Sequence, residues 1–187
     1  MSYVLFVSED KLKDSTAING NVDVDFLLPY VKISQKIYVE TKLGTDLYQK
    51  LEAEITAGTL AGAYKTLVDE YIGDMLCQWA FYECIPFLRF KIQNGNIYSK
   101  TSENGTAISD TEASSLREEI RNTAEYYTER LINYLRFNNA SFPEYSTSSG
   151  ADVKPNTDAY FSGMNLSRSN GQGNKLTLRN FLTSDLT

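Results

Sequence analysis

The side chains of this sequence that are capable of chemistry are few, and their spacing does not bring them together. Histidine is absent from all 187 residues, which removes the commonest general base and every His-dependent catalytic triad. The adjacent carboxylates Glu118 and Glu119 lie in a predicted helix, as do Asp69 and Glu70, so each pair diverges instead of meeting at one reacting bond. An enzyme built from this chain would depend on a carboxylate or a tyrosine. We predict a protein that is not an enzyme and carries no cofactor.

The two cysteines, Cys77 and Cys84, are the other candidates for chemistry. On a helix they would share a face and be separated by roughly 10 Å of axial rise, which is too far for a disulfide. Two thiols are also too few for a structural zinc site, and nothing else in the sequence supplies soft ligands. We therefore expect both to be buried as small hydrophobic residues, and we predict no metal.

The most apolar stretch, DMLCQWAFYECIPFLRFKIQN, contains both cysteines and Trp79, the one tryptophan of the chain. A membrane-spanning helix needs about twenty residues with few charges, whereas this stretch carries Asp74, Glu83 and Arg89. Aromatic residues at helical spacing more often pack in a core than line a ligand pocket. The stretch is therefore predicted to be the middle of a core helix, without contact to a membrane.

The charge balance also excludes classes of partner. The chain has 24 Asp and Glu against 18 Lys and Arg, and no basic run that would track a nucleic acid backbone, which disfavours sequence-specific DNA binding. The glycine-containing run from Asn170 to Gly173 lacks the pattern of a phosphate-binding loop and is interpreted as a linker. No basic residue precedes the apolar run near the start, so we expect no secretion signal and a protein kept in a cytoplasm.

Apolar residues at helical spacing predict four helices, over residues 25–44, 46–56, 63–90 and 109–138. The last begins with a capping box from Ser109 to Glu112. The β-branched and aromatic run YVLFV predicts a strand at residues 3–7. Asn104 and Gly105 predict the turn of a β-hairpin near residues 96–108, with that strand as its sheet partner. The expected fold is mainly α: a four-helix bundle with a small β-hairpin or sheet and an extended C-terminal tail.

A change of composition after Asn138 divides the chain into a helical domain, residues 1–138, and a polar C-terminal arm, residues 139–187. The arm is rich in Ser, Thr, Asn and Gly and cannot bury a core of its own. Its apolar residues form short clusters of the kind that become ordered on a partner, either by adding a strand or by filling grooves. The predicted partner-binding residues are Tyr160, Phe161, Met164, Leu166, Leu176, Leu178, Phe181 and Leu182.

The order of these parts resembles a known family. The motif Leu43-Gly44-Thr45-Asp46-Leu47-Tyr48 follows the first helix, and a long aromatic helix runs through Tyr82 to Phe90. The turn from Gln93 to Asn96 comes next, and the final helix ends in LINYL. Together they resemble the helical head–tail connector (adaptor) proteins of tailed bacteriophages, and are similar in particular to the ring proteins of the crAss-like phages of gut Bacteroidota. The resemblance covers roughly residues 20–138, and the long polar arm goes beyond the minimal connector pattern.

The resemblance implies a structural virion protein that forms a homo-oligomeric ring, usually a dodecamer, between the portal and the tail. Such a ring extends the DNA channel, is assembled in the host cytoplasm, and contacts the portal and other tail or ring proteins. An acidic chain suits a channel through which DNA slides without specific binding. The arm would then reach a neighbouring subunit or the portal, adding many weak contacts. The alternative is a tail completion protein or another virion binding module with a different partner.

Overall fold

The structure is a computed structural model that describes residues 4–18, 22–93, 96–99, 109–147, 149 and 152–157. As predicted, the fold is mainly α. The helices are α1 (Glu9–Ser15), α2 (Val24–Ser34), the π-helical η1 (Gln35–Glu40), α3 (Thr41–Leu43), α4 (Thr45–Ala57), α5 (Gly62–Thr66), the π-helical η2 (Leu67–Ile72), α6 (Gly73–Arg89), α7 (Asp110–Phe137), the short 3-10 turn η3 (Asn139–Ser141) and α8 (Pro143–Ser146).

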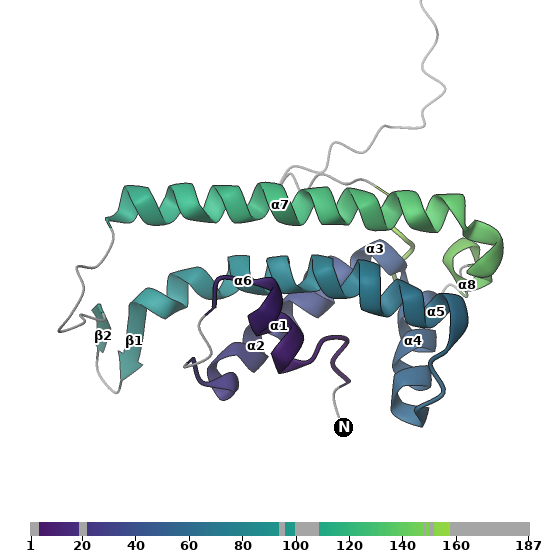
Figure 1. Cartoon of the computed structure of the whole chain (residues 1–187), viewed down its shortest axis with the longest axis horizontal. Helices are drawn as coiled ribbons and strands as arrows, with labels where there is room; N and C mark the ends of the chain where they lie inside the picture. The colour runs from purple at the N-terminus through teal and green to yellow at the C-terminus, as the bar shows by residue number, and fades with distance from the viewer. Residues whose placement is uncertain are drawn as a thin grey trace, which may run out of the picture.

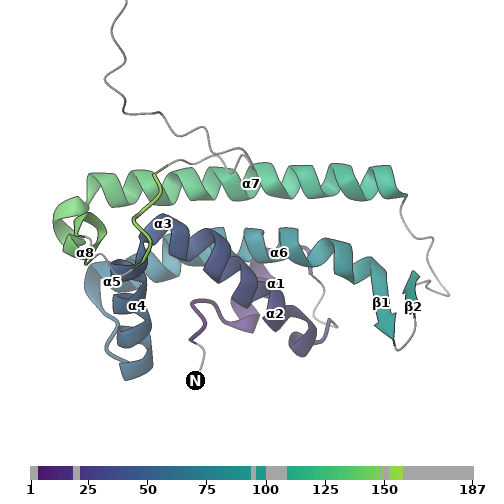
Figure 2. The same cartoon turned by 180° about the vertical axis from the view of Figure 1, so that it is seen from behind.

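Two long rods form the spine of the molecule (Figure 1). One is α5, η2 and α6, which follow one another without a break, and the other is α7, which lies along them. Helices α1 and α2 contact α6 from the side away from α7, and Figure 2 shows the same order of layers from behind. The central rod is therefore covered on both sides, which explains why its sequence is apolar nearly all round.

The predicted start of the last helix is confirmed in atomic detail. The Ser109 side chain accepts a hydrogen bond from the backbone N–H of Glu112, and the Glu112 carboxylate accepts one from the backbone N–H of Ser109 at 2.8 Å. This reciprocal capping box satisfies two N–H groups that the helix itself leaves without partners.

The core is centred on Trp79 of α6, which is 2% exposed. Its indole N–H donates to the hydroxyl of Thr128 on α7 at 3.0 Å. On its other side the ring of Tyr38 from η1 stacks on the indole, with centroids 3.8 Å apart and planes 8° apart. The Tyr38 hydroxyl donates to Glu83 at 2.6 Å, and burial together with this carboxylate raises the pKa of Tyr38. Trp79 thus joins three elements, as the core interpretation of its stretch predicted.

Both cysteines are buried and free, also as predicted. Burial raises the pKa of Cys77 to about 11 and that of Cys84 to about 12, so both remain neutral thiols at physiological pH. None of the helices in the described ranges has both the length and the apolar character needed to cross a bilayer.

A small hairpin follows the central rod. Strands β1 (Phe90–Gln93) and β2 (Asn96–Ser99) pair antiparallel, with Phe90 opposite Ser99. The strands flank the other Asn-Gly pair of this region, Asn94-Gly95, and the described sheet has no third strand. The hairpin turn predicted at Asn104-Gly105 falls outside the described residues.

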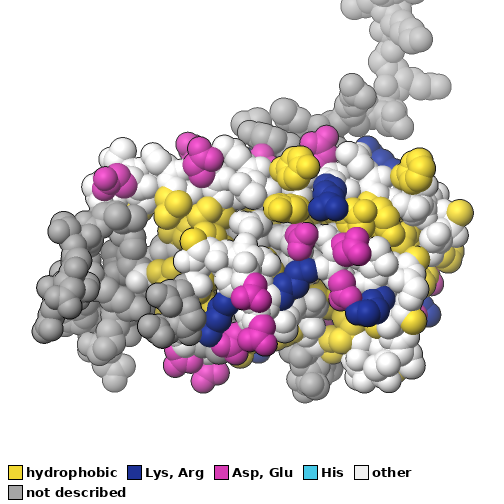
Figure 3. Space-filling model, viewed as in Figure 1, with side chains coloured by type: hydrophobic (Ala, Val, Ile, Leu, Met, Phe, Trp, Pro, Cys, Tyr) yellow, Lys and Arg dark blue, Asp and Glu magenta, His cyan; other side chains and the backbone are white. Residues whose placement is uncertain are grey.

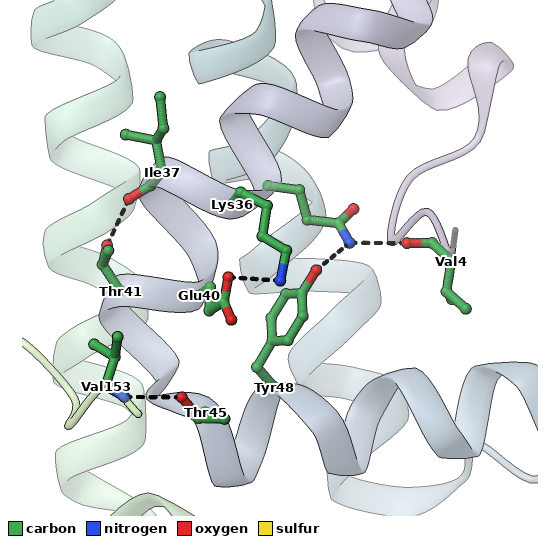
Figure 4. Close-up of polar contacts among 9 residues, drawn as sticks. Val4, Lys36, Ile37, Glu40, Thr41, Thr45, Tyr48 and Val153 are labelled. Atoms are coloured by element: carbon green, nitrogen blue, oxygen red, sulfur yellow. Dashed lines mark hydrogen bonds and ion pairs between the residues drawn. The ribbon is translucent and has the colours of Figure 1, made fainter. Parts of the chain in front are cut away.

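The strand predicted at residues 3–7 is wrong for residues 4–7, which the structure describes as irregular. The side chain of Gln35, buried in η1, takes the place of a neighbouring strand. Its amide oxygen accepts from the backbone N–H of Phe6 at 3.1 Å, and its amide nitrogen donates to the backbone carbonyl of Val4 at 2.9 Å. The same nitrogen donates to the Tyr48 hydroxyl at 2.9 Å, as Figure 4 shows. One side chain therefore satisfies backbone groups that a sheet would otherwise pair.

Candidate interaction site for the C-terminal arm

The eight predicted partner-binding residues, from Tyr160 to Leu182, lie outside the described residues. The structure does describe the start of the arm, at residues 139–147, 149 and 152–157. These residues lie against the helical domain of the same chain, and their contacts define a site that can be analysed residue by residue.

The first contact of the arm is a buried aromatic residue. After α7, η3 and α8 fold back, and Phe142 between them is fully buried against the rings of Tyr64 and Tyr134. The Tyr64 hydroxyl donates to the carboxylate of Glu144 at 2.7 Å, and burial and this bond raise the pKa of Tyr64 to about 12. The hydrophobic core therefore extends past the predicted boundary at Asn138 and includes Phe142.

The second contact is made at the corner between α3 and α4. Gly44 separates the two helices with φ at 77° and ψ at 160°, a conformation that is nearly restricted to glycine. Leu43 before it and Leu47 after it are fully buried, so the corner is held rigidly on the core. A helix start leaves backbone N–H groups without partners, and a helix end leaves carbonyls.

The arm supplies partners for both kinds of group. The backbone N–H of Thr45, at the start of α4, donates to the carbonyl of Val153 at 3.0 Å. The N–H of Val153 donates back to the Thr45 hydroxyl at 3.0 Å, as Figure 4 shows. The backbone N–H of Asn156 donates to the carbonyl of Thr41 at 2.9 Å. Pro155 lies directly over Gly44, where a Cβ atom would be 2.6 Å from its Cδ.

A carboxylate at the same corner strengthens the attachment. Asp46 accepts from the Ser149 hydroxyl at 2.6 Å and from the Ser149 backbone N–H at 2.7 Å, and these two bonds lower the pKa of Asp46. Further along, the guanidinium of Arg136 donates to the carbonyl of Thr157 at 3.2 Å. We call the surface formed by Thr41, Gly44, Thr45 and Asp46 the docking corner.

The docking corner is suited to holding an extended segment. Four of its hydrogen bonds use only the backbone of the arm, so they recognise an extended chain more than particular side chains. Pro155 and Ser149 add the side-chain contacts that fix its position. Three residues of the docking corner, Gly44, Thr45 and Asp46, belong to the motif Leu43–Tyr48, which also contributes to the resemblance to connector proteins. Sequence reasoning found this motif but not its partner, because the arm residues that bind it have no pattern of their own.

Other kinds of site find less support in the described ranges. Among these residues no group of three or more His, Cys, Asp or Glu side chains is placed to hold a metal ion. The carboxylates of the docking corner and of Glu144 are already engaged with hydroxyl or amide donors. What this region offers is recognition of a polypeptide.

Comparison with protein families matches residues 39–155 to the family of unknown function DUF6712. The matched range begins in η1 and ends at Pro155, so it includes the docking corner and the arm residues up to the proline above Gly44. Comparisons with the curated proteins and with the solved structures found no match.

Proposed function

The chain belongs to DUF6712, a family of unknown function, and from its own structure we propose that it is a structural virion protein. In this proposal it forms a ring between the portal and the tail and extends the DNA channel, as a head–tail connector does. The observation that carries the proposal is that the motif Leu43–Tyr48, one of the parts that carry the resemblance, supplies three of the four docking-corner residues that hold the arm. A ring protein with such an extension needs a place to attach it.

The helical rods agree with this proposal. The proposed connector-type bundle of four rods is supported by four continuous helical segments, α2–η1–α3, α4, α5–η2–α6 and α7. They pack around one hydrophobic core, so each copy is a rigid unit that many contacts can position. The acidic balance of the chain, with net charge −6, suits a channel that DNA passes without specific binding.

Two exposed apolar pairs supply faces for a ring contact. Ile33 and Ile37, at the junction of α2 and η1, are 45% and 40% exposed, and Tyr126 and Phe137, three turns apart on α7, are 64% and 90% exposed. Figure 3 shows apolar side chains reaching the surface along α7. A closed ring is built by joining one face of a subunit to a different face of the next. We assign the isoleucine pair and the α7 pair to these two faces.

The arm beyond Thr157 is proposed to make the remaining contacts of the ring. Its apolar residues, the clusters around Tyr160 and Leu176, are proposed to bind the portal or a neighbouring subunit. A ring repeats each such contact in every copy, so weak individual contacts add up to a stable attachment.

Sedimentation velocity of the full chain, alone and mixed with its portal protein, tests the proposal. We expect a ring-sized species, and we expect Phe137→Ser to shift it to monomer because the most exposed aromatic ring is lost from the contact. Asn133→Ser, one turn earlier on the exposed side of α7, is the matched control and should assemble normally. A wild-type chain that stays monomeric with and without portal would overturn the ring, and binding to another virion protein would favour a tail completion module.

A further inference from the structure

A hollow of about 430 Å³ lies where the arm crosses the end of α7. Its walls come from two separate segments of the chain. Residues Arg136, Asn139, Tyr145, Ser146 and Thr147 belong to the end of α7 and the turns that follow it, and Lys154, Pro155 and Thr157 belong to the docked arm. The hollow is complete only while the arm occupies the docking corner.

The charge of this hollow is opposite to that of the chain. Among the described residues, its lining contains two cations, Arg136 and Lys154, and no Asp or Glu, although acidic residues outnumber basic ones in the whole sequence. In the described ranges most lysines and arginines pair with a carboxylate or lie over an aromatic ring, for example Lys11 with Asp74. Arg136 and Lys154 have neither kind of partner among these residues. The one bond of Arg136 goes to the carbonyl of Thr157, which does not neutralise its charge.

Polar donors accompany the two cations. The hydroxyl of Tyr145 is buried and has no hydrogen-bond partner among the described residues, which costs free energy unless a ligand supplies one. The Ser146 hydroxyl donates to the amide oxygen of Asn139, so the amide nitrogen of Asn139 remains as a donor. The hydroxyls of Thr147 and Thr157 complete the lining. The described part of the wall therefore offers guanidinium, ammonium, amide and hydroxyl donors, and no carboxylate competes with them there.

We propose that this hollow is a binding site for a dianionic phosphate group. Its two cations, which have no carboxylate partner among the described residues, match two negative charges, whereas a carboxylate would leave one cation unneutralised. Guanidinium groups bind phosphate oxygens in a bidentate fashion, and lysine contributes a second point charge. The volume admits a phosphate group with part of the molecule that carries it.

Because the walls come from two segments, phosphate binding and docking of the arm are thermodynamically linked. A ligand that binds only the docked form stabilises it, and an arm that is released takes Lys154 out of the site. Phosphate should therefore hold the arm on the docking corner, and a loosened arm should lower phosphate affinity.

Isothermal titration calorimetry of the full chain with inorganic phosphate, at constant ionic strength, tests the site. We expect saturable binding, weakened about tenfold or more by Arg136→Gln and by Lys154→Gln, because each removes a charge-assisted contact. Lys13→Gln on α1 removes the same charge but does not line the hollow, and it should bind normally. Figure 1 shows α1 away from α8 and the end of α7 that form the hollow. Thermal melting followed by circular dichroism checks that each variant is folded. We expect Lys154→Gln to fold normally because the Lys154 side chain is exposed.

Additional ligands and one additional variant identify the source of the phosphate group. A nucleoside monophosphate, which carries a dianionic ester, should bind like phosphate, and acetate should bind far more weakly. Asp46→Ala, which loosens the arm, should weaken phosphate binding without touching the hollow. The proposal is overturned if phosphate does not bind, if Lys13→Gln weakens it as much as Lys154→Gln, or if acetate binds equally. It is also overturned if duplex DNA binds in proportion to its length, since that would indicate a diffuse basic surface.

Discussion

Both carboxylate oxygens of Asp46 accept hydrogen bonds from Ser149, a residue 103 positions later in the chain. This contact joins the start of α4 to the start of the arm, and it is the most strongly polar part of the docking corner. Because a carboxylate at the start of a helix also interacts favourably with the helix dipole, Asp46 stabilises α4 and the docked arm together.

Replacing Asp46 by Asn should release the arm while the core stays folded. The Asn amide presents donors where Ser149 also presents donors, so one of the two hydrogen bonds is lost and the other loses its charge. Hydrogen exchange should become faster at the amides of Ser149, Val153 and Asn156. Glu52→Gln on the same helix makes the same charge change away from the arm and should leave these amides protected, as should the wild type.

Acid should loosen the arm for the same reason. The pKa of Asp46 is lower with the arm docked than its ordinary value of 3.8, so its contribution to docking is complete above that value and is lost as the pH falls below it. The amide NMR signals of Ser149 and Val153 should move toward their free positions in this range. Asp46→Asn has no carboxylate to titrate at this position and should lack this acid transition. An unchanged transition in that variant would show that another group causes it.

Gly44→Ala should both strain the corner and displace the arm. Its ψ of 160° at positive φ costs a side chain about 1–3 kcal/mol, and the new Cβ would meet Pro155 at 2.6 Å. Gly58→Ala is the matched control, since its φ is also positive but nothing lies within 4 Å of the added atom. Urea unfolding should report a loss of stability in both variants, and proteolysis should cut the arm faster in Gly44→Ala alone. Equal cleavage in the two would show that Pro155 does not rest on Gly44 in solution.

Thr128→Val should destabilise the core by about 1–3 kcal/mol, because it leaves the buried indole N–H of Trp79 without an acceptor. Thr123→Val on the exposed face of α7 loses the same kind of local hydroxyl bond to a backbone carbonyl and should cost much less. Chemical denaturation followed by Trp79 fluorescence measures both. If the two variants lose equal stability, the bond between Trp79 and Thr128 contributes little.

Truncation separates the parts of the arm. A chain that ends at Thr157 should keep both the core and the docked segment, and one that ends at Thr147 should keep the core alone. A chain that ends at Asn138 loses Phe142 and should be less stable by about 3–5 kcal/mol, the usual cost of removing a buried aromatic side chain. Thermal unfolding of the three chains should show one large step in stability, between the last two. A large loss already at Thr147 would place the docked segment in the core.

The helices could be predicted because their signals are local. Ser109 and Glu112 are three residues apart, and the apolar stripe of α7 repeats along the same helix, so the sequence contains both partners of each contact. The strand at residues 3–7 was wrong because its backbone is paired by Gln35, a side chain some thirty residues away. The π-helical segments η1 and η2 were also missed, since an extra residue in a helix leaves the apolar spacing almost unchanged.

Only one side of the candidate site, the corner between the two helices, could be predicted from the sequence. Gly44, Thr45 and Asp46 have the residue types expected where one helix ends and another begins. Nothing in the order of residues pairs them with Ser149, Val153 and Pro155, because an extended segment bound through its backbone has little sequence signature. Phe142 was assigned to the arm for a similar reason. Its neighbours in the sequence are mostly polar, and only the fold brings it beside Tyr64.

The two attachments of the arm differ in how they would respond to mechanical load. A pull on the last residues of the chain reaches the bond between Arg136 and Thr157 and then the docking corner before it reaches the buried ring of Phe142. Under tension the docking corner can therefore release the arm and lengthen the free segment by several residues. The buried ring of Phe142 would then still protect the helices from unfolding.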